Sequence, residues 1–520
     1  MKSPCDEAVI QTGAMASPCL EKSRPWILAA AILGSSMAFI DSTVVNVALP
    51  ALQSGLHATV VDVQWIIESY GLFLSALILA GGALGDTFGR RAMFLLGVGT
   101  FAVSSAGCSF SSSIQALLFW RSLQGIAGAF LVPGSLAIVS SSFDEASRGR
   151  AIGTWAGFTT MTTALGPVLG GWLIDHASWH WVFFINVPFA AVVVAISLRH
   201  VPESRDSNAG RVDWSGAALV TLGLAGLVYG FLESPVRGWT NPLVIGGLTL
   251  GSLLLIAFVW VEKKSAAPMV PLQLFQSPSF CGANLLTLFL YSALGIFFFL
   301  YPLNLIQIQK YSATATGAAA LPTILLASLL ARWSGGLIAR FGAKLPLVVG
   351  PLIVAAGFIL FALPGAQTEY WKSFFPAFVV LGFCLAITVA PLTTVVMNSV
   401  GQERAGAASG INNAVARVAG VLAVAVLGVV MVSAFTRSLD RSLANSKVDP
   451  AIVHQLESNS DRLGSLSAPA SADPHTSSII RDAVAQAFVF GFRMIVLICA
   501  GLAVASAAIA YRRVPDNLSR

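Results

Sequence analysis

The chain reads Gly82-Ala83-Leu84-Gly85-Asp86-Thr87-Phe88-Gly89-Arg90-Arg91 between two long apolar segments, residues 65–84 and 92–110. Each apolar segment is long enough for a membrane helix, which needs about 20 residues. Glycine allows the backbone to turn tightly, and the charged side chains require water. This stretch therefore predicts two transmembrane helices joined by a short polar turn at a membrane surface.

The composition extends this interpretation to the whole chain. Of its 520 residues, 56% are hydrophobic and only 10% are charged, whereas a soluble domain carries about 25% charged residues. We predict an all-α integral membrane protein with fourteen transmembrane helices. The predicted spans are residues 27–49, 65–84, 92–110, 114–140, 151–174, 181–198, 214–232, 243–261, 280–305, 317–338, 345–363, 374–396, 408–434 and 485–510.

Lysine and arginine predict the orientation. If the N-terminus is inside, more than half of the 30 basic residues fall in inside segments, and the short outside loops hold only Arg237, Lys310 and Lys372. Basic residues collect on the cytoplasmic side, so we expect a multi-pass protein of the cell membrane with both termini in the cytoplasm. The net charge of +6 would then face anionic lipid, and no clustered basic face predicts a nucleic-acid partner.

Two common features are not predicted. Residues 1–25 are polar and the next apolar run is too long for a signal peptide, so we expect no cleavage. The six cysteines show no paired spacing, so neither a metal site nor a disulfide framework is predicted. No cofactor is expected.

The polar turn recurs in the second half of the chain. Its second copy reads Gly335-Gly336-Leu337-Ile338-Ala339-Arg340-Phe341-Gly342-Ala343-Lys344, with Ala339 in place of the aspartate. Arg148-Gly149-Arg150-Ala151 is likewise echoed by Arg404-Ala405-Gly406-Ala407. Two matches in corresponding places predict a duplication: two six-helix bundles related by a pseudo-twofold axis, plus two inserted central helices.

The predicted organisation therefore has five parts. They are a cytoplasmic tail (1–25), an N-terminal bundle (26–200), a linker with the inserted helices (201–265), a C-terminal bundle (266–511) and a second cytoplasmic tail (512–520). The C-terminal bundle includes a long extracytoplasmic loop, residues 435–484, in which we expect at most a short helix near 450–456.

Several motifs together resemble those of the major facilitator superfamily, and fourteen spans resemble its drug:proton antiporter branch. They are the G-x-L-x-D-x-x-G-R-R turn at 82–91, Asp41-Ser42-Thr43-Val44-Val45-Asn46-Val47-Ala48-Leu49-Pro50, Arg121-Ser122-Leu123-Gln124-Gly125, Gly157 with Gly166-Pro167-Val168-Leu169-Gly170-Gly171, and Trp179-His180-Trp181-Val182-Phe183-Phe184-Ile185-Asn186-Val187-Pro188. The resemblance covers nearly the whole chain after residue 25.

Asp41 is the residue predicted to carry proton coupling. It lies about 15 residues into the first span, roughly 22 Å along the helix, inside the hydrocarbon. Intramembrane acids are rare and usually functional, although a structural hydrogen bond to a neighbouring helix is the alternative. The resemblance implies that Arg121 sets the protonation state of this acid, directly or through Gln124. A purely structural role for Arg121 remains open.

Glu68 is a second candidate for proton coupling, near the outer end of the second span. A carboxylate there would favour cationic cargo, whereas simple solvation at the interface is the alternative. A substrate cavity between the two halves is expected to include Asn46, Gln124 and Trp155.

The turn itself is predicted to form a cytoplasmic gate. Asp86 would face the N-terminal end of a helix in the other half, and the arginines would reach the next inside loop. The expected gate residues are Gly82, Asp86, Gly89, Arg90, Arg91, Asp144 and Glu145. Thr87 departs from the usual basic residue of the family, which weakens this gate.

The resemblance also implies an antiporter motif in the fifth span, made of Gly157, Gly166, Pro167, Gly170 and Gly171. A tight, bent helix seam would limit proton leak, although plain helix packing explains the same residues.

These features predict a monomeric exporter, not an enzyme, which exchanges protons for hydrophobic, cationic drugs by alternating access. Its partners would be a small-molecule substrate, protons and the lipid bilayer. Export of one physiological cargo, such as a lipid, a secondary metabolite or a self-made antibiotic, is the main alternative. A membrane sensor or enzyme is a weaker one, because the histidines are scattered and no soluble output domain is present.

Overall fold

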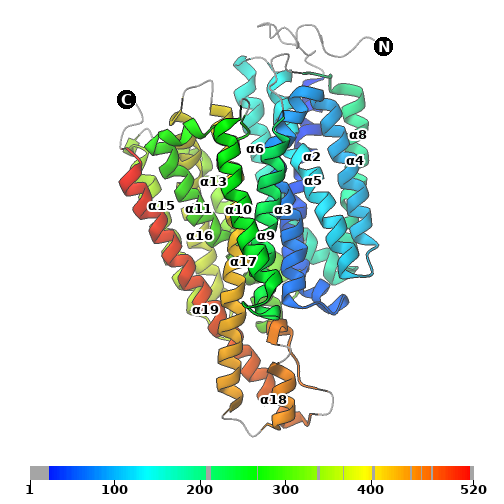
Figure 1. Ribbon diagram of the computed structural model, residues 1–520, viewed down its shortest axis with the longest axis vertical. Helices are drawn as coiled ribbons and strands as arrows, with labels where there is room; N and C mark the ends of the chain where they lie inside the picture. Colours follow the sequence, from blue (N-terminus) through cyan, green and yellow to red (C-terminus); the bar gives the residue numbers. More distant parts are fainter. Residues whose placement is uncertain are drawn as a thin grey trace. The chain divides into compact units, whose positions relative to one another are not determined.

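The computed structural model describes residues 23–143, 145–205, 212–265, 268–335, 340–366, 368–400, 405–444, 448–457, 460–469 and 472–515. Within them every regular element is a helix (Figure 1). The helices up to the inserted pair are α2 (Arg24–Gly55), α3 (Val60–Phe88), α4 (Arg90–Ser109), α5 (Ile114–Ser142), α6 (Glu145–His176), α7 (His180–Phe184), α8 (Asn186–His200), α9 (Trp214–Arg237) and α10 (Pro242–Lys264). The later ones are η1 (Leu272–Gln276), α11 (Pro278–Leu303), η2 (Asn304–Ile308), α12 (Ala313–Ala319), α13 (Leu321–Gly335), α15 (Lys344–Ala362), α16 (Tyr370–Asn398), α17 (Ala405–Ala444), α18 (Pro450–Glu457), η4 (Ser460–Ser465) and α19 (Pro474–Arg513).

Twelve helices of the described residues are long and apolar enough to cross a membrane. The predicted count of fourteen is therefore not confirmed. The two predicted spans outside this set, 151–174 and 317–338, lie on α6 and on α12 with α13. α6 begins with a polar turn and contains five threonines, which lower its hydropathy. α13 is short, at 15 residues.

Helical structure also enters the segment predicted as a long outside loop. α17 and α19 each contain 40 residues, which gives a length of about 60 Å. α17 continues beyond its apolar part because Leu439 and Leu443 are buried on one face while Arg437 and Arg441 are exposed on another. α19 starts early because Asp473 accepts hydrogen bonds from its first turn, beside Pro474. α18 occupies the place of the expected short helix and lies at the far end of α17 (Figure 1).

The chain divides into two compact units. Unit 1 comprises Met1–Val45, Ser69–Ala225 and Gly251–Pro271, and unit 2 comprises Asn46–Glu68, Gly226–Leu250 and Leu272–Arg520. The core of unit 1 is built around Phe94 and Phe101, which are fully buried. Its helices approach closely at glycine residues, which have no side chain. A Cβ on Gly125 of α5 would overlap the carbonyl oxygen of Tyr70 on α3.

Unit 2 has an aromatic core. The ring of Phe297 on α11 packs against Phe361 with centroids 4.6 Å apart and against Phe358 at 5.5 Å. Arg493, an intramembrane arginine with no role assigned from the sequence, donates hydrogen bonds of 3.2 Å to the carbonyl oxygens of Leu363 and Pro364 just after α15. Arg493 therefore satisfies carbonyl groups that the end of a helix leaves free.

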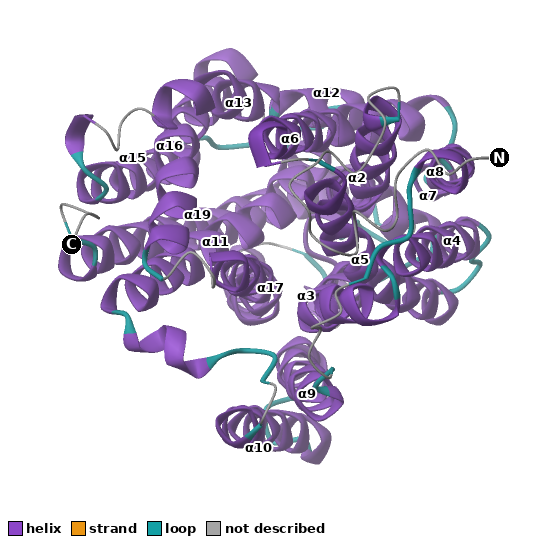
Figure 2. Cartoon of the chain, turned by 90° about the horizontal axis from the view of Figure 1, so that it is seen from above, coloured by secondary structure: helices purple, strands orange, loops and turns teal. Residues whose placement is uncertain are grey.

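The inserted helices α9 and α10 lie side by side (Figure 2). Glycines bring them together along their length. A Cβ on Gly223 of α9 would lie 2.8 Å from the side chain of Leu255, and one on Gly247 of α10 would lie 3.0 Å from the carbonyl oxygen of Gly226. Close backbone approach through small residues is a common way for membrane helices to associate.

Candidate functional site

A buried ion pair lies at the centre of unit 1. Asp41 on α2 is fully buried and Arg121 on α5 is 1% exposed. Arg121 Nη1 donates to Asp41 Oδ2 at 2.5 Å and to Gln124 Oε1 at 2.8 Å. Gln124 Nε2 in turn donates to Asp41 Oδ1 at 3.0 Å. Arg121 and Gln124 reach the same carboxylate because residues three apart share one face of a helix.

A second set of groups surrounds this ion pair. Asn186 Nδ2, at the start of α8, lies 3.4 Å from Asp41 Oδ1, and Gln124 Nε2 also donates to Ser105 Oγ of α4 at 2.7 Å. The guanidinium of Arg121 lies 4.4 Å from the ring centroid of Tyr70 on α3 and 5.8 Å from that of Phe183 on α7. Cation–π contacts with desolvated rings favour the charged arginine.

The structure thus brings together three residues predicted from the sequence and three that sequence reasoning missed. Asp41, Arg121 and Gln124 were predicted, whereas Asn186 and Ser105 were given no site role and Tyr70 was not considered. Asn186 could have been found as a polar residue in an apolar span, because such residues need partners within the bundle. Ser105 and Tyr70 carry no such signal, because serine and tyrosine are common in membrane helices.

Glu68 has a different environment. It is fully buried on α3, and neither side-chain oxygen has a hydrogen-bond partner. The alternative of a solvated interfacial acid does not fit this burial. One turn before it, Trp65 Nε1 donates to Glu233 Oε1 at 3.1 Å, and Glu233 also pairs with Arg237 at 2.7 Å. Glu233 is thus held in two contacts.

Two of the predicted cavity residues, Trp155 and Asn46, belong to different units. Trp155 Nε1 donates to Ser35 Oγ at 3.2 Å, so the indole lies against α2 within unit 1. Asn46 is half-buried in the part of α2 that belongs to unit 2. Their role in a substrate cavity stays a prediction.

The turn between α3 and α4 forms a compact charged cluster. Arg90 Nε donates to Asp86 Oδ1 at 2.8 Å. The backbone N–H groups of Arg91 and Ala92, in the first turn of α4, donate to the carboxylate of Glu203 at 3.0 Å each. This carboxylate stands at the positive end of α4, where an anion is favoured. Gly89 has φ +120°, and a Cβ there would lie 2.7 Å from Glu203 Oε1.

Glu203 is a partner that sequence reasoning missed. The arginines were expected to reach Asp144 or Glu145, whereas the carboxylate beside Arg91 in the structure is that of Glu203. Glu203 lies more than 100 residues further along the chain, so no local pattern indicates this contact. Asp144 and the side chain of Glu145 lie outside the described residues. At Gly82, a Cβ would meet Pro133 at an ordinary 3.5 Å.

The antiporter motif lies on α6 and contains one glycine that does not share the role of the others. A Cβ on Gly166 would overlap Thr43 Oγ1 and one on Gly170 would overlap the side chain of Val44, whereas Gly157 has no such neighbour within 4 Å. Pro167 lies inside α6, and Gly171 is buried next to Gly170. The motif therefore brings α6 against α2 within three residues of Asp41.

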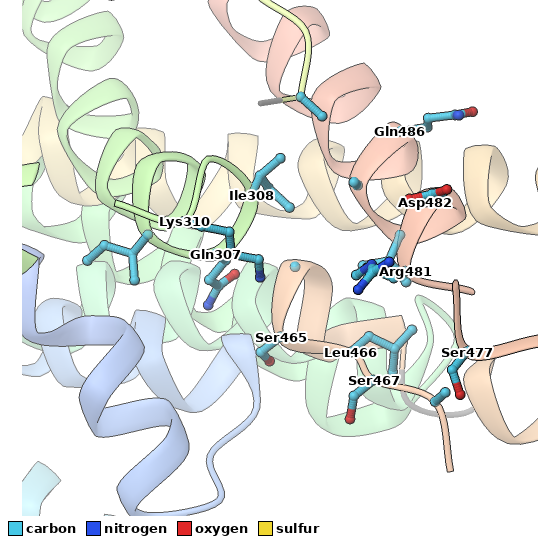
Figure 3. Close-up of a pocket in the computed structure, with 16 residues that line it drawn as sticks. Gln307, Ile308, Lys310, Ser465, Leu466, Ser467, Ser477, Arg481, Asp482 and Gln486 are labelled. Atoms are coloured by element: carbon cyan, nitrogen blue, oxygen red, sulfur yellow. The ribbon is translucent and has the colours of Figure 1, made fainter. Parts of the chain in front are cut away.

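Unit 2 also contains a pocket of about 750 Å³, formed by the end of η2, η4 with the segment after it, and the start of α19. Gln307 and Arg481 lie on opposite sides of this space (Figure 3). Gln307 Nε2 donates to Gln53 Oε1 at 2.8 Å, which fixes the C-terminal end of α2 to η2 within this unit.

A family model described as the Major Facilitator Superfamily matches residues 31–424. The chain belongs to the major facilitator superfamily. This superfamily is one of transporters and not a class of enzymes, and the helices identify this member as a multi-pass membrane protein.

This superfamily member is similar to several resistance proteins. It is 33% identical to the tetracenomycin C resistance and export protein of Streptomyces glaucescens over 94% of this chain and 91% of that protein. It is also 33% identical to the multidrug resistance protein Stp of Mycobacterium tuberculosis, with coverage of 84% and 81%. The puromycin resistance protein pur8 of Streptomyces alboniger is 32% identical, with coverage of 79% and 82%.

Solved structures of the superfamily share its fold. A bacterial homolog of the human lysosomal transporter Spinster matches with a TM-score of 0.66 and 17% identity, over 96% of this chain and 98% of that one. A D-xylose–proton symporter matches with a TM-score of 0.60 and 13% identity, over 94% and 98%. At these identities the likeness shows the helical architecture alone.

Proposed function

We propose that this protein exports antibiotics and other hydrophobic, cationic drugs in exchange for protons. Relatives named for drug and antibiotic resistance, one of them an export protein, support the cargo class. The fully buried network of Asp41, Arg121 and Gln124 supports the coupling, because it joins an ionisable carboxyl to the packing of two helices.

Protonation of Asp41 would change the network in a defined way. A neutral carboxyl gives up its charge attraction to Arg121, and a buried arginine without a counter-ion is costly. Arg121 must then find another acceptor, so α2 and α5 repack. A site whose proton occupancy depends on helix packing links proton binding to alternating access, and proton and cargo affinities then change reciprocally.

Glu68 would serve as a second acidic site. Its two buried oxygens lack donors, so a proton or a cationic group of the cargo would satisfy them. The membrane potential contributes about 2.3 kcal/mol per net charge per 100 mV, so it drives the exchange when more protons enter than cargo charges leave. The clusters at Asp86 and Glu203 would form the cytoplasmic gate, with both termini in the cytoplasm.

The decisive experiment is flux in proteoliposomes under an imposed pH gradient, with a panel of cationic and neutral compounds. The wild type should accumulate a cationic dye when the gradient is present. In Asp41→Asn the rate of accumulation should fall at least about tenfold, which corresponds to 1.4 kcal/mol. Glu369→Gln, at an exposed surface pair with Lys372, is the matched control. Equal flux without any gradient would identify a facilitator instead.

The relatives also favour a narrower version of this function. A named export protein for a single antibiotic, tetracenomycin C, is among them. Export of one physiological cargo is therefore the second candidate. Growth of a deletion strain and an overexpressing strain on an antibiotic panel separates the two: a broad pump changes resistance to many compounds, and a dedicated exporter to one.

A further inference from the structure

Two acidic side chains meet at the open end of the α9–α10 pair, opposite the loop that connects these helices. Asp213 precedes α9, and Glu262 lies in the last turn of α10. Glu262 is 2% exposed. Neither residue belongs to the Asp41 network or to the cluster at the α3–α4 turn.

Each carboxyl uses one oxygen to hold the backbone. Asp213 Oδ1 accepts from Gly216 N at 2.8 Å and from Ser215 Oγ at 2.7 Å, which caps the first turn of α9. Glu262 Oε2 accepts from Val270 N at 3.0 Å, which fixes the segment after α10. These contacts satisfy one carboxylate oxygen of Asp213 and one of Glu262.

The other two oxygens are buried and have no hydrogen-bond partner among the described residues. They are Asp213 Oδ2 and Glu262 Oε1. Both converge on Gly216, because a Cβ placed there would lie 2.8 Å from each of them. The two oxygens are therefore separated by no more than twice that distance, and the missing side chain of Gly216 leaves room for them.

No described cation neutralises this pair. Lys263 and Lys264 follow Glu262 but are exposed, and Lys264 Nζ lies 3.9 Å from the ring centroid of Trp260. The first turns of α9 and the segment 268–276 contain no ionisable residue. The described residues also offer no third carboxylate, histidine or cysteine that would complete a metal site.

We propose that Asp213 and Glu262 bind one proton between them and that this proton holds the open end of the α9–α10 pair together. Two buried carboxylates at this separation repel each other, and a single proton converts them into an acid–carboxylate hydrogen bond. Glu262, the more buried of the two, carries the proton and donates it to Asp213 Oδ2. On the proposed orientation, this site is in contact with the cytoplasm and responds to its pH.

The sign of the pH effect follows from proton linkage. The folded pair retains a proton that the separated carboxyls of the unfolded chain release, so the stabilisation is present at low pH and lost as the pH rises. Thermal unfolding of the purified, full-length protein from about pH 6 to about pH 9 measures this. The wild type should lose a few degrees of Tm across this range. Glu262→Gln should remain flat, because its amide N–H replaces the shared proton.

Infrared spectroscopy provides a direct readout. The carbonyl absorption of a protonated carboxyl should be present in the wild type near neutral pH and should lose one component in Glu262→Gln. Gly216→Ala should also remove it, because the added methyl group stands between the two oxygens. Gly246→Ala, on the same pair of helices with nothing within 4 Å of its Cβ, is the matched control.

Three outcomes would overturn the proposal. One is an unchanged pH dependence and infrared spectrum in both Glu262→Gln and Asp213→Asn. The second is a wild type that lacks this pH dependence while Arg211→Gln acquires it, which would assign the counter-charge to an arginine outside the described residues. The third is a rise of Tm with Mg²⁺ or Ca²⁺ that Glu262→Gln abolishes, which would identify a metal site. None of these measurements involves transport, so the proposed function stands or falls separately.

Discussion

At the scale of single residues, Asp41 is held by its neighbours in a buried hydrogen-bond network. An isolated aspartate in hydrocarbon would be costly, but this one accepts hydrogen bonds from Arg121 and Gln124. Asp41 and Arg121 were predicted as charged residues within apolar spans, and Gln124 through the motif that resembles the superfamily's. The sequence could not predict Glu203, and it could mark Asn186 only as a polar residue without naming its partner, because contacts between residues far apart in the chain depend on how the helices pack.

Removing both members of the buried pair should cost less stability than the sum of the two single removals. Arg121→Met leaves the buried Asp41 without its cationic partner, so we expect a loss of about 3–5 kcal/mol in stability. In the double variant Asp41→Asn/Arg121→Met, the loss should be clearly smaller than the sum of the two single losses. Denaturation of all three variants in one detergent checks this.

The control for this double-mutant cycle is Arg237, whose side chain is 44% exposed where it pairs with Glu233. Arg237→Gln should change stability by less than about 1 kcal/mol. Strict additivity in the Asp41–Arg121 cycle would show that the two side chains are not energetically coupled.

At the scale of helices, glycine positions separate close contacts from open surface. On α6, Gly166 and Gly170 face Thr43 and Val44 of α2, while Gly157 faces nothing within 4 Å. The motif in the sequence marked all three glycines equally. The structure distinguishes them, because periodicity predicts which residues share a face but not whether a neighbouring helix touches that face.

Alanine substitutions on α6 should therefore have opposite effects. Gly170→Ala forces α6 away from α2 and should destabilise the protein by about 1–3 kcal/mol, with slower proton-coupled flux. Gly157→Ala should be neutral or stabilising by up to about 1 kcal/mol, because alanine is the better helix former. Thermal unfolding together with flux measures both. Equal losses in the two variants would contradict the close α2–α6 contact.

The α3–α4 turn allows a second test at this scale. Gly89→Ala should be strongly unfavourable, because φ +120° suits glycine and the added methyl group meets Glu203. Glu203→Gln retains the shape but weakens the interaction with the start of α4, so its loss should be about 0.3–2 kcal/mol and smaller at high salt. A Glu203→Gln loss that salt leaves unchanged would exclude the electrostatic explanation.

At the scale of the whole molecule, the length of the apolar segments predicted a helical membrane protein, because the bilayer imposes this length on the sequence. The resemblance of several motifs predicted the superfamily. The number of spans is less well determined by these rules. α6 and α13 are not among the twelve clearly apolar helices, because threonines lower the hydropathy of α6 and α13 has only 15 residues.

The predicted topology can be tested by labelling with a membrane-impermeant thiol reagent. In a background without native cysteines, Ser467→Cys should react from outside intact cells, and Lys264→Cys only after the membrane is opened; both sites are exposed. Fourteen spans with cytoplasmic termini require these opposite results. Reaction of both sites from the same face would contradict the topology.

The length of α17 and α19 has a further mechanical consequence. Each helix is about 60 Å long, whereas the hydrocarbon layer is about 30 Å thick. When a continuous helix tilts about a point within the hydrocarbon layer, the end farthest from that point moves most. A small tilt of α17 or α19 therefore displaces the ends beside α18 more than the segments within the bilayer. A fluorophore attached to these ends would report such a tilt more sensitively than one attached within the bilayer.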